Sequence, residues 1–291
     1  MNPASRTSSD ISNLVWVTGA GGLIGSHIVH LAKDLAPAFQ AIGLTRSKLD
    51  LLDFVAVTAL FHREKPAAII HCAAMTKTQD CQADPAMARR INVESTTLLA
   101  RLAADIPFML LSTDLVFDGQ KGDYVESDAV NPLSVYAETK VAAERIVMGN
   151  PRHIVIRTSL NCGVSPTGDR SFDEQIQMAW KRGETLSFFT DEFRCPIPAT
   201  ATARACWELL QKGQTGLFHV AGSEKLSRAQ IGSSLADRHR TLSPRFGTGS
   251  LKGYIGAPRS PDTSLNSSKA QAQLSFALPK FSSWVRASEI C

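Results

Sequence analysis

Tyr136 and Lys140 are the two residues whose types and spacing most directly suggest chemistry, because they stand four positions apart in the run YAETK. In a helix, positions i and i+4 share one face, so the phenol and the ammonium group would point the same way. A nearby positive charge lowers the pKa of a tyrosine, which helps the phenol exchange a proton near neutral pH. The pair therefore predicts a tyrosine that moves a proton, with a lysine beside it.

A second chemical signal is the run STD at 112–114, which ends a short apolar stretch that we expect to form a strand. The carboxyl ends of parallel strands form the edge at which open α/β sheets bind their ligands. A hydroxyl at this edge can form a hydrogen bond with a substrate carbonyl. A glycine-rich turn near the start of the chain, this strand-end hydroxyl and the Y-x-x-x-K pair, in this order, form a joint signal that is far stronger than any part.

A third signal is the run TGAGGLIG at 18–25, whose glycines have the spacing G-x-x-G-x-x-G. One glycine permits the tight turn from strand to helix, another lets the backbone approach a pyrophosphate, and the third lets the helix lie close on the strand. The free N–H groups and the positive dipole end of the following helix would face the phosphates. The turn therefore predicts a dinucleotide site, contacted by Gly19, Gly22, Leu23, Ile24 and Gly25.

Arg46 follows the second predicted strand and bears on the choice of cofactor. An acidic residue at this place would bind the ribose 2′-hydroxyl of NAD, whereas an arginine suits the 2′-phosphate of NADP. We therefore expect NADP(H) as the cofactor, with NAD(H) as the alternative. A solvated surface arginine is the competing interpretation of this residue.

Alternating strands and helices must position these groups. Short apolar runs predict the strands, and stretches with helical spacing predict the helices between them. This alternation is typical of βαβ crossovers and predicts an α/β fold, a doubly wound parallel sheet (Rossmann fold) with a smaller C-terminal substrate lobe. The expected strands are 14–18, 40–44, 67–71, 108–112, 153–158 and 216–220, the expected helices are 23–36, 53–64, 85–104, 133–148, 173–181 and 199–212, and 185–198 is expected to be irregular.

The same pattern predicts how the chain is divided. Residues 1–12 are polar and serine-rich, and we expect a disordered leader there. Residues 13–160 would form the NADP(H)-binding core, which 199–222 would complete. Residues 161–198 and 223–291 would form the smaller substrate lobe over the carboxyl edge of the sheet.

Composition and charge limit the classes of protein to which the chain can belong. The net charge is +4 over 291 residues and the basic residues are scattered, so nothing indicates a nucleic-acid partner. The six cysteines form no C-x-x-C pair, so we assign no metal site and expect reduced thiols. No apolar run is long enough to span a membrane, and we expect a cytoplasmic protein without a membrane partner. The isolated His27 and His71 are interpreted as packing or hydrogen-bonding residues.

The chain resembles the extended short-chain dehydrogenase/reductase superfamily and, within it, the dTDP-4-dehydrorhamnose reductase family. The resemblance runs from about residue 14 to about residue 284. STDLVFDG and PLSVYAETK are quite specific to this subfamily. The segments that carry the resemblance are TGAGGLIG (18–25), LDLLD (49–53), HCAAMTKTQDCQADP (71–85), INV (91–93), STDLVFDG (112–119), NPLSVYAETKVAAE (131–144), RTSL (157–160) and PRSPDTSLNSSK (258–269).

This resemblance implies a role for each residue of the chemical signals. Tyr136 would protonate the carbonyl oxygen that is reduced, and Lys140 would hold the nicotinamide ribose and lower the pKa of Tyr136. Thr113 would orient the carbonyl, and Asp114 would contact the sugar. The hydride would come from NADPH, so the protein would chiefly position its two partners. Further residues are implied around the cofactor: Cys72, Ala73 and Ala74 after the third strand, Asp50 and Leu51 near the adenine, and Asn92 as a brace for the fold.

Two positions depart from the pattern of the family. Leu115 stands where the family usually has a tyrosine, and Leu160 stands where it usually has a tryptophan. Both aromatics normally touch the sugar nucleotide, so their loss weakens the case for dTDP-4-dehydrorhamnose and leaves a related substrate open. Arg194 and Arg259 are candidates for binding an anionic diphosphate, and surface charge is the competing interpretation.

The leading hypothesis is an NADP(H)-dependent reductase of a keto-sugar nucleotide, and the sequence is compatible with a homodimer. One alternative is a cofactor-binding regulatory subunit, because the same subfamily resembles the non-catalytic partner of methionine adenosyltransferase. The intact Thr113, Tyr136 and Lys140 favour an enzyme, whereas Leu115 and Leu160 favour the partner role or another substrate. Another alternative is a nucleotide-sugar epimerase or dehydratase, although 114–115 does not clearly supply the extra carboxylates of a dehydratase.

Overall fold

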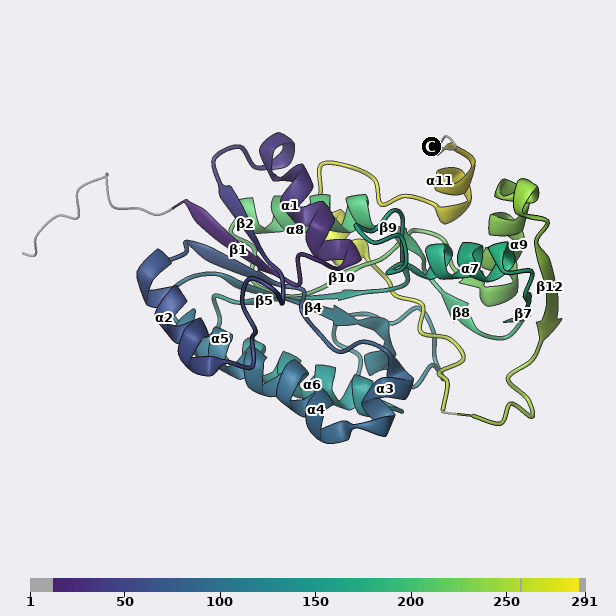
Figure 1. Ribbon diagram of the computed structural model, residues 1–291, viewed down its shortest axis with the longest axis horizontal. Helices are drawn as coiled ribbons and strands as arrows, with labels where there is room; N and C mark the ends of the chain where they lie inside the picture. Colours follow the sequence, from purple (N-terminus) through teal and green to yellow (C-terminus); the bar gives the residue numbers. More distant parts are fainter. Residues whose placement is uncertain (1–12, 257, 288–291) are drawn as a thin grey trace, which may run out of the picture.

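The computed structural model describes residues 13–256 and 258–287, and its centre is a sheet of six parallel strands in the order β10-β5-β4-β3-β1-β2 (Figure 1). The order of the strands switches between β1 and β3, which is the place where doubly wound sheets bind ligands. The predicted α/β fold, with its parallel sheet and a smaller C-terminal region, is confirmed. The strands are β1 Leu14–Thr18, β2 Gln40–Leu44, β3 Ala68–His71, β4 Phe108–Thr113, β5 Ile154–Thr158 and β10 Gly216–Val220.

Helices cover both faces of the sheet because its central strands are apolar on both sides; all six residues of β4 are buried. On one face, Trp207 donates its indole N–H to the carbonyl of Ile28 over 2.9 Å and so links the two helices there. The other face packs around Trp16 of β1. The helices of the first face are α1 Leu23–Leu35 and α8 Ala199–Gln211, and those of the second are α2 Phe54–Glu64, α5 Ser95–Leu102 and α6 Val135–Met148 (Figure 1).

Two side chains fix where helices begin. Asp53 caps α2, and its carboxylate accepts the N–H of Ala56 over 2.9 Å. Ser134 caps α6 by accepting the N–H of Ala137 over 3.3 Å. Tyr136 is therefore in the first turn of α6.

The expected helix over 85–104 is interrupted, so that prediction is wrong in detail. The structure has α4 (Pro85–Arg89), a π-helical turn (Arg90–Glu94) and then α5. A π turn adds one residue to the helical repeat and often marks a functional site. Helical spacing alone could not reveal this inserted residue. A short helix that the sequence did not predict, α3 Thr78–Ala83, precedes it.

The smaller C-terminal region has its own core, in which Trp180 and Phe281 are buried. The expectation that 185–198 is irregular is wrong, because Thr185–Phe189 forms β7 and pairs in parallel with β12 (Arg245–Gly249). That partner lies about sixty residues further along the chain, so local patterning does not indicate it. The remaining elements are β6 Asn161–Cys162, α7 Phe172–Lys181, β8 Phe193–Arg194, β9 Ile197–Pro198, β11 Leu226–Ser227, α9 Arg228–Arg238, α10 Ser268–Gln271, α11 Phe281–Ala287 and 3-10 turns at Asp114–Val116 and Arg240–Leu242.

The segment 258–265 returns from the smaller region to the carboxyl edge of the sheet. The hydroxyl of Ser260 donates to the carbonyl of Phe117 over 2.9 Å. Leu265 forms a parallel bridge with Tyr124, and Asp262 forms one with Phe193. This segment therefore ties the edge of the sheet to β8.

Three further expectations concern the first twelve residues, membrane spans and metal sites. The expected leader, 1–12, lies outside the described residues. Within 13–256 and 258–287, no helix has the length and apolar character needed to cross a membrane. The same ranges contain no cluster of three or more histidine, cysteine, aspartate or glutamate residues that could hold a metal ion.

Candidate active site

The glycine turn after β1 is shaped by close backbone contacts. Gly19 has a φ of +68°, and a Cβ on it would lie 2.6 Å from the backbone nitrogen of Ala73. A Cβ on Gly25 would overlap the carbonyl oxygen of Gly19, so α1 can lie this close to the turn only without a side chain there. Gly21 differs, because a Cβ there would meet only a methyl group of Thr45 at 3.7 Å.

The first turn of α1 offers backbone donors to a ligand. Gly22 is the N-cap and supplies no side-chain cap, and the first turn contains no acidic residue. The N–H groups of Leu23, Ile24 and Gly25 have no partner among the hydrogen bonds of the described chain. Such donors, together with the positive end of the helix dipole, fit a pyrophosphate. The cradle therefore fits a dinucleotide cofactor.

The loops after β2 and β3 complete this part of the site. Arg46 is exposed, and no carboxylate of the described chain lies within ion-pair distance of it; beside it, the hydroxyls of Thr45 and Ser47 are 2.9 Å apart. Ala73 donates its N–H to the hydroxyl of Thr18 over 3.4 Å. Burial raises the pKa of the Cys72 thiol to about 12, so this thiol is not a nucleophile at neutral pH. Of the other residues implied near the cofactor, Leu51 is partly buried, Asp50 accepts the N–H of Leu52 over 3.0 Å, and Ala74 continues the loop after β3.

His71, the last residue of β3, links this strand to Thr18 at the end of β1. Its Nδ1 lies 2.6 Å from the hydroxyl of Thr18, and its Nε2 lies 3.1 Å from the hydroxyl of Thr96. Burial lowers the pKa of His71 to about 3, so the ring is neutral at physiological pH. The interpretation of His71 as a hydrogen-bonding residue is confirmed, and the bond to Thr18 supports the strand that ends at the glycine turn.

Tyr136 and Lys140 lie on α6 below the carboxyl edge, and both are nearly buried. Lys140 donates its ammonium group to the carbonyl of Leu111 over 2.7 Å. Burial lowers the pKa of Lys140 to about 8 and raises the pKa of Tyr136 well above its usual range, against the opposing effect of a hydrogen bond with Thr113. Lys140 is not among the causes of this shift, so its expected lowering of the pKa of Tyr136 stays a prediction. The cost of burying a phenolate dominates, and it keeps the proton on the tyrosine at neutral pH.

Asn92, in the π turn, is bonded to α6, the helix that carries Tyr136 and Lys140. Its side-chain amide donates to the hydroxyl of Thr139 over 2.9 Å, and that hydroxyl donates to the carbonyl of Tyr136 over 2.7 Å. The amide also exchanges hydrogen bonds with both backbone groups of Met75, at 2.8 and 3.0 Å. Asn92 therefore braces the loop after β3 against α6.

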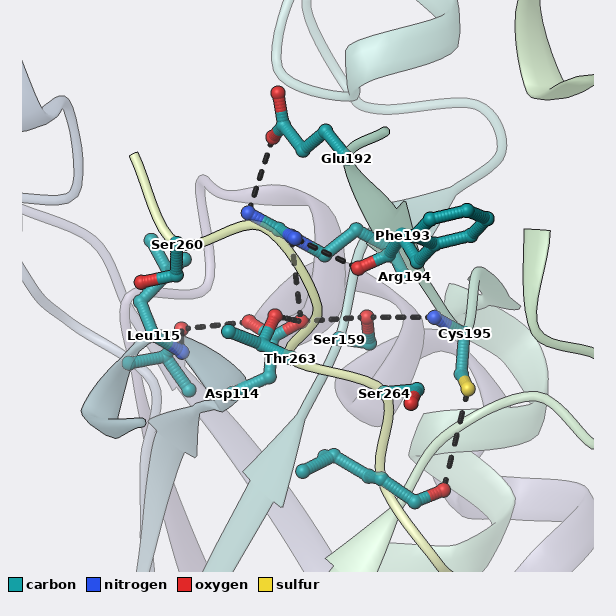
Figure 2. A network of polar contacts seen from close by, with 12 residues as sticks. Asp114, Leu115, Ser159, Glu192, Phe193, Arg194, Cys195, Ser260, Thr263 and Ser264 are labelled. Carbon is teal, nitrogen blue, oxygen red and sulfur yellow. Dashed lines mark hydrogen bonds and ion pairs between the residues drawn. The ribbon is translucent and has the colours of Figure 1, made fainter. Parts of the chain in front are cut away.

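Asp114 lies at the centre of a buried polar network (Figure 2). Its carboxylate accepts hydrogen bonds from Ser159 over 2.7 Å and from Thr263 over 3.2 Å, and Nε of Arg194 lies 3.8 Å away. Burial raises the pKa of Asp114, whereas Arg194 and the hydroxyls act against this rise. The predicted sugar contact, Asp114, lines the cleft, but its side chain also holds the ends of β4 and β5 to the segment 258–265.

Glu192 forms an ion pair with each of the two arginines that the sequence suggested as anion ligands. Its buried carboxylate accepts hydrogen bonds from Arg194 over 3.0 Å and from two nitrogens of Arg259 over 2.8 and 2.9 Å. Figure 2 shows the contact with Arg194 above the Asp114 network. Sequence reasoning missed a third arginine of the cleft, Arg228, which no motif marks and which only the fold brings to this place.

The structure brings these groups around two adjoining hollows. The first, of about 330 Å³, lies at the carboxyl edge and contains Thr113, Tyr136, Asp114 and Arg194 in its lining; Leu115 and Leu160, the two departures from the family pattern, also line it. The second, of about 290 Å³, lies in the smaller region and is bounded by aromatic rings, including Phe172, Phe188 and Phe189. Arg228 and Arg259 line both hollows and so mark where they meet.

Comparison with known proteins places the chain in a family. Residues 13–288 match the family described as the RmlD substrate binding domain. The chain belongs to this family. It is thus a dTDP-4-dehydrorhamnose reductase-like member of the extended short-chain dehydrogenases/reductases, and the resemblance stated from the sequence is confirmed.

Two curated relatives differ in what their names describe. "Probable low-salt glycan biosynthesis reductase Agl14" of Haloferax volcanii is 31% identical over 240 residues, which cover 76% of this chain and 79% of the relative. Methionine adenosyltransferase 2 subunit beta of Xenopus laevis is 29% identical over 238 residues, which cover 76% of this chain and 70% of the relative. The family therefore includes both reductases and a subunit of another enzyme.

Solved structures agree with the fold over nearly the whole chain. A hypothetical dTDP-4-dehydrorhamnose reductase from Sulfolobus tokodaii has a TM-score of 0.81 and 30% identity, covering 92% of this chain and 97% of its own. The dTDP-4-dehydrorhamnose reductase of Bacillus anthracis, in complex with NADP, has a TM-score of 0.84 and 21% identity, covering 94% of this chain and 98% of its own.

Proposed function

We propose that this protein is an NADP(H)-dependent reductase that acts on the carbonyl group of a keto-sugar nucleotide. The observation that carries the proposal is that Thr113 and Tyr136 line a hollow at the carboxyl edge of the sheet, beside the switch point where the uncapped start of α1 lies. A second hollow with aromatic walls adjoins the first. This pair of hollows suits a substrate with a sugar at one end and a base at the other.

In the proposed reaction, some residues of this chain bind the cofactor, and others orient the carbonyl and donate a proton. When bound, the reduced nicotinamide supplies a hydride to the substrate carbon. The backbone N–H groups of Leu23 and Ile24 hold the pyrophosphate, and Lys140 holds the nicotinamide ribose. Thr113 donates a hydrogen bond that orients the carbonyl oxygen. Tyr136 gives its phenolic proton to that oxygen, so the carbonyl gains a hydride and a proton and becomes a hydroxyl.

Tyr136 holds the proton that reduction of a carbonyl requires. Burial raises the pKa of its phenol and so weakens it as an acid, whereas the hydrogen bond with Thr113 acts in the opposite direction. Burial also removes competing water, which strengthens the hydrogen bonds that align the carbonyl. The proposal therefore needs no further acid in the cleft.

The experiment is oxidation of NADPH, followed at its absorbance, with a panel of keto-sugar nucleotides. We expect turnover with at least one member and a loss of about 10²- to 10⁴-fold in kcat for Tyr136→Phe, with NADPH affinity retained. Turnover that survives in Tyr136→Phe would refute the assignment of the proton donor.

Arg46 supports NADP(H) over NAD(H), because its guanidinium is exposed beside β2 and lacks an ion-pair partner in the described chain. We expect Arg46→Ala to weaken NADPH binding by about tenfold or more and to leave NADH binding unchanged, since only NADPH carries the 2′-phosphate. Arg101→Ala, an exposed arginine on α5, is the matched control. Equal losses for both cofactors, or a tenfold preference of the wild type for NADH, would overturn this choice.

A second candidate is a cofactor-binding regulatory subunit, which the similarity to methionine adenosyltransferase 2 subunit beta favours. This function predicts tight NADP(H) binding without turnover of any keto-sugar nucleotide. It also predicts that a methionine adenosyltransferase catalytic subunit forms a complex with this protein in a pull-down with purified components. NADPH oxidation that depends on Tyr136 would favour the reductase instead.

A further inference from the structure

The cleft carries an excess of positive charge near the place where the two hollows meet. Three guanidinium groups, those of Arg194, Arg228 and Arg259, line the cleft together with the carboxylates of Glu192 and Asp114. Three cations against two anions leave one positive charge without a counter-charge. The distribution of contacts identifies where that charge resides.

Arg228 is the guanidinium without a carboxylate partner. Glu192 binds Arg259 through two hydrogen bonds and Arg194 through a third, and Asp114 adds a longer contact to Arg194. Within 13–256 and 258–287, Arg228 has no carboxylate within 4.0 Å, and no side-chain hydrogen bond engages its guanidinium. The group instead lies over the ring of Phe172, 5.6 Å from the ring centre.

The backbone of Arg228 is held in place, whereas its guanidinium makes no side-chain hydrogen bond within the described residues. Arg228 is the first residue of α9, and its N–H donates to the carbonyl of Glu192 over 2.8 Å. Ser227 and Gln230 close the start of that helix with a reciprocal pair of hydrogen bonds, so an anion would meet the side chain of Arg228 rather than the helix end. Burial lowers the pKa of Arg228 to about 10, and the group remains charged at neutral pH. A partly buried cation without a partner costs free energy, which an anionic ligand would offset.

We propose that Arg228 is the residue that binds the diphosphate of the substrate, while Glu192 reserves Arg194 and Arg259 for the protein's own structure. The proposal rests on the proposed function for the class of substrate. It places the phosphates at the junction of the hollows, with the base towards Phe172 and Phe188 and the sugar towards Tyr136. A guanidinium is suited to this task because its parallel N–H groups match two phosphate oxygens.

The test measures binding rather than turnover. The full-length protein, saturated with NADP⁺ so that its cofactor site is filled, is titrated with dTDP and with UDP by calorimetry. We expect at least one of them to bind, Arg228→Gln to weaken that binding by about tenfold or more, and Arg228→Lys to weaken it less. Arg240→Gln, an exposed arginine of the same region that pairs with Asp237, is the matched control and should bind as the wild type does.

Two readouts separate binding by Arg228 from a structural role. Arg228→Gln should unfold at or above the temperature of the wild type, because no ion pair is lost and a charge without a counter-charge is removed, whereas Arg194→Gln should unfold at a lower temperature. Arg228→Gln that binds the diphosphate as tightly as the wild type would overturn the proposal, and so would a wild type that binds neither dTDP nor UDP. The reductase proposal is judged separately by NADPH oxidation and Tyr136→Phe, so either proposal can fail while the other holds.

Discussion

Asn92 donates a hydrogen bond to Thr139 over 2.9 Å, and this contact joins the π turn to the helix that carries Tyr136 and Lys140. The amide of Asn92 is buried and fully engaged, because its other hydrogen bonds go to the backbone of Met75. The loop after β3 and α6 are therefore both held by Asn92, whose place in the π turn brings its amide within hydrogen-bond distance of both.

Removing that brace should cost both stability and activity. We expect Asn92→Ala to lower the free energy of unfolding by about 2 kcal/mol, because buried groups of Met75 and Thr139 lose their partners. It should also lower kcat more than it changes KM for the carbonyl substrate, because Tyr136 loses its support. Chemical unfolding and steady-state kinetics measure the two effects. The control is Asn131→Ala, because the exposed side-chain amide of Asn131 donates only to Asp118, over 3.0 Å. If the two changes had equal effects, Asn92 would have no special role.

The glycines of the cofactor turn should differ in their tolerance of a methyl group. Gly25→Ala would force a Cβ into the carbonyl of Gly19, so we expect a loss of about 1–3 kcal/mol in stability together with weaker NADPH binding. Gly21→Ala has space for its Cβ and should leave the unfolding temperature unchanged. Thermal unfolding of the two variants side by side makes the comparison, and a Gly21→Ala variant that unfolds at a lower temperature than Gly25→Ala would contradict the packing described here.

The lysine of the site should give activity and stability opposite dependences on pH. Burial lowers the pKa of Lys140 from 10.5 to about 8, so the ammonium group loses its proton above about pH 8 and kcat/KM for reduction should fall there. Between these two values the unfolded chain holds a proton that the folded protein has released. The contribution of Lys140 to the free energy of unfolding therefore rises with pH across this window.

Lys140→Met provides the control for both effects. This variant should have low activity with no alkaline fall centred near pH 8, and its stability should lack the rise between pH 8 and 10.5 that the wild type gains from this group. Activity profiles and denaturant titrations at each pH give the measurement. An alkaline fall of kcat/KM that persists unchanged in Lys140→Met would assign it to another group.

Glu192 should matter chiefly for stability. Glu192→Gln would remove the counter-charge of Arg259 and the nearer of the two carboxylates at Arg194, and we expect a loss of about 3 kcal/mol because a broken buried ion pair leaves uncompensated charge. Glu184→Gln removes an exposed pair with Arg182 and should have little effect. Equilibrium unfolding in urea compares the two variants. A Glu192→Gln protein as stable as Glu184→Gln would show that the cleft does not need this carboxylate.

The parts of the fold that local sequence determines could be predicted. Apolar runs predicted the six strands of the sheet, and the glycine spacing of 18–25 predicted the turn between the first strand and the first helix, because each signal lies within a few residues of the chain. The parallel pair of β7 and β12 could not be predicted, since its two strands are joined only in space. The π turn was also missed, because one inserted residue barely disturbs helical spacing.

In the candidate site, too, local motifs could be predicted and contacts between distant segments could not. Tyr136, Lys140 and Thr113 could be named because short motifs contain them. The roles of the arginines could not be assigned, because Glu192 and Arg228 are far apart in sequence and only the fold brings them to one cleft. The direction of the pKa shift of Tyr136 depends on burial, which sequence does not show.

The return of the segment 258–265 to the edge of the sheet has a consequence for biosynthesis. All six strands of the sheet are made once the ribosome has passed residue 220, but Ser260, Asp262 and Thr263, which bond to the edge of the sheet and to β8, follow about forty residues later. Domains form as the nascent chain emerges, N-terminal part first. A growing chain thus contains the whole sheet and its glycine turn before it contains the segment that links the edge of the sheet to β8.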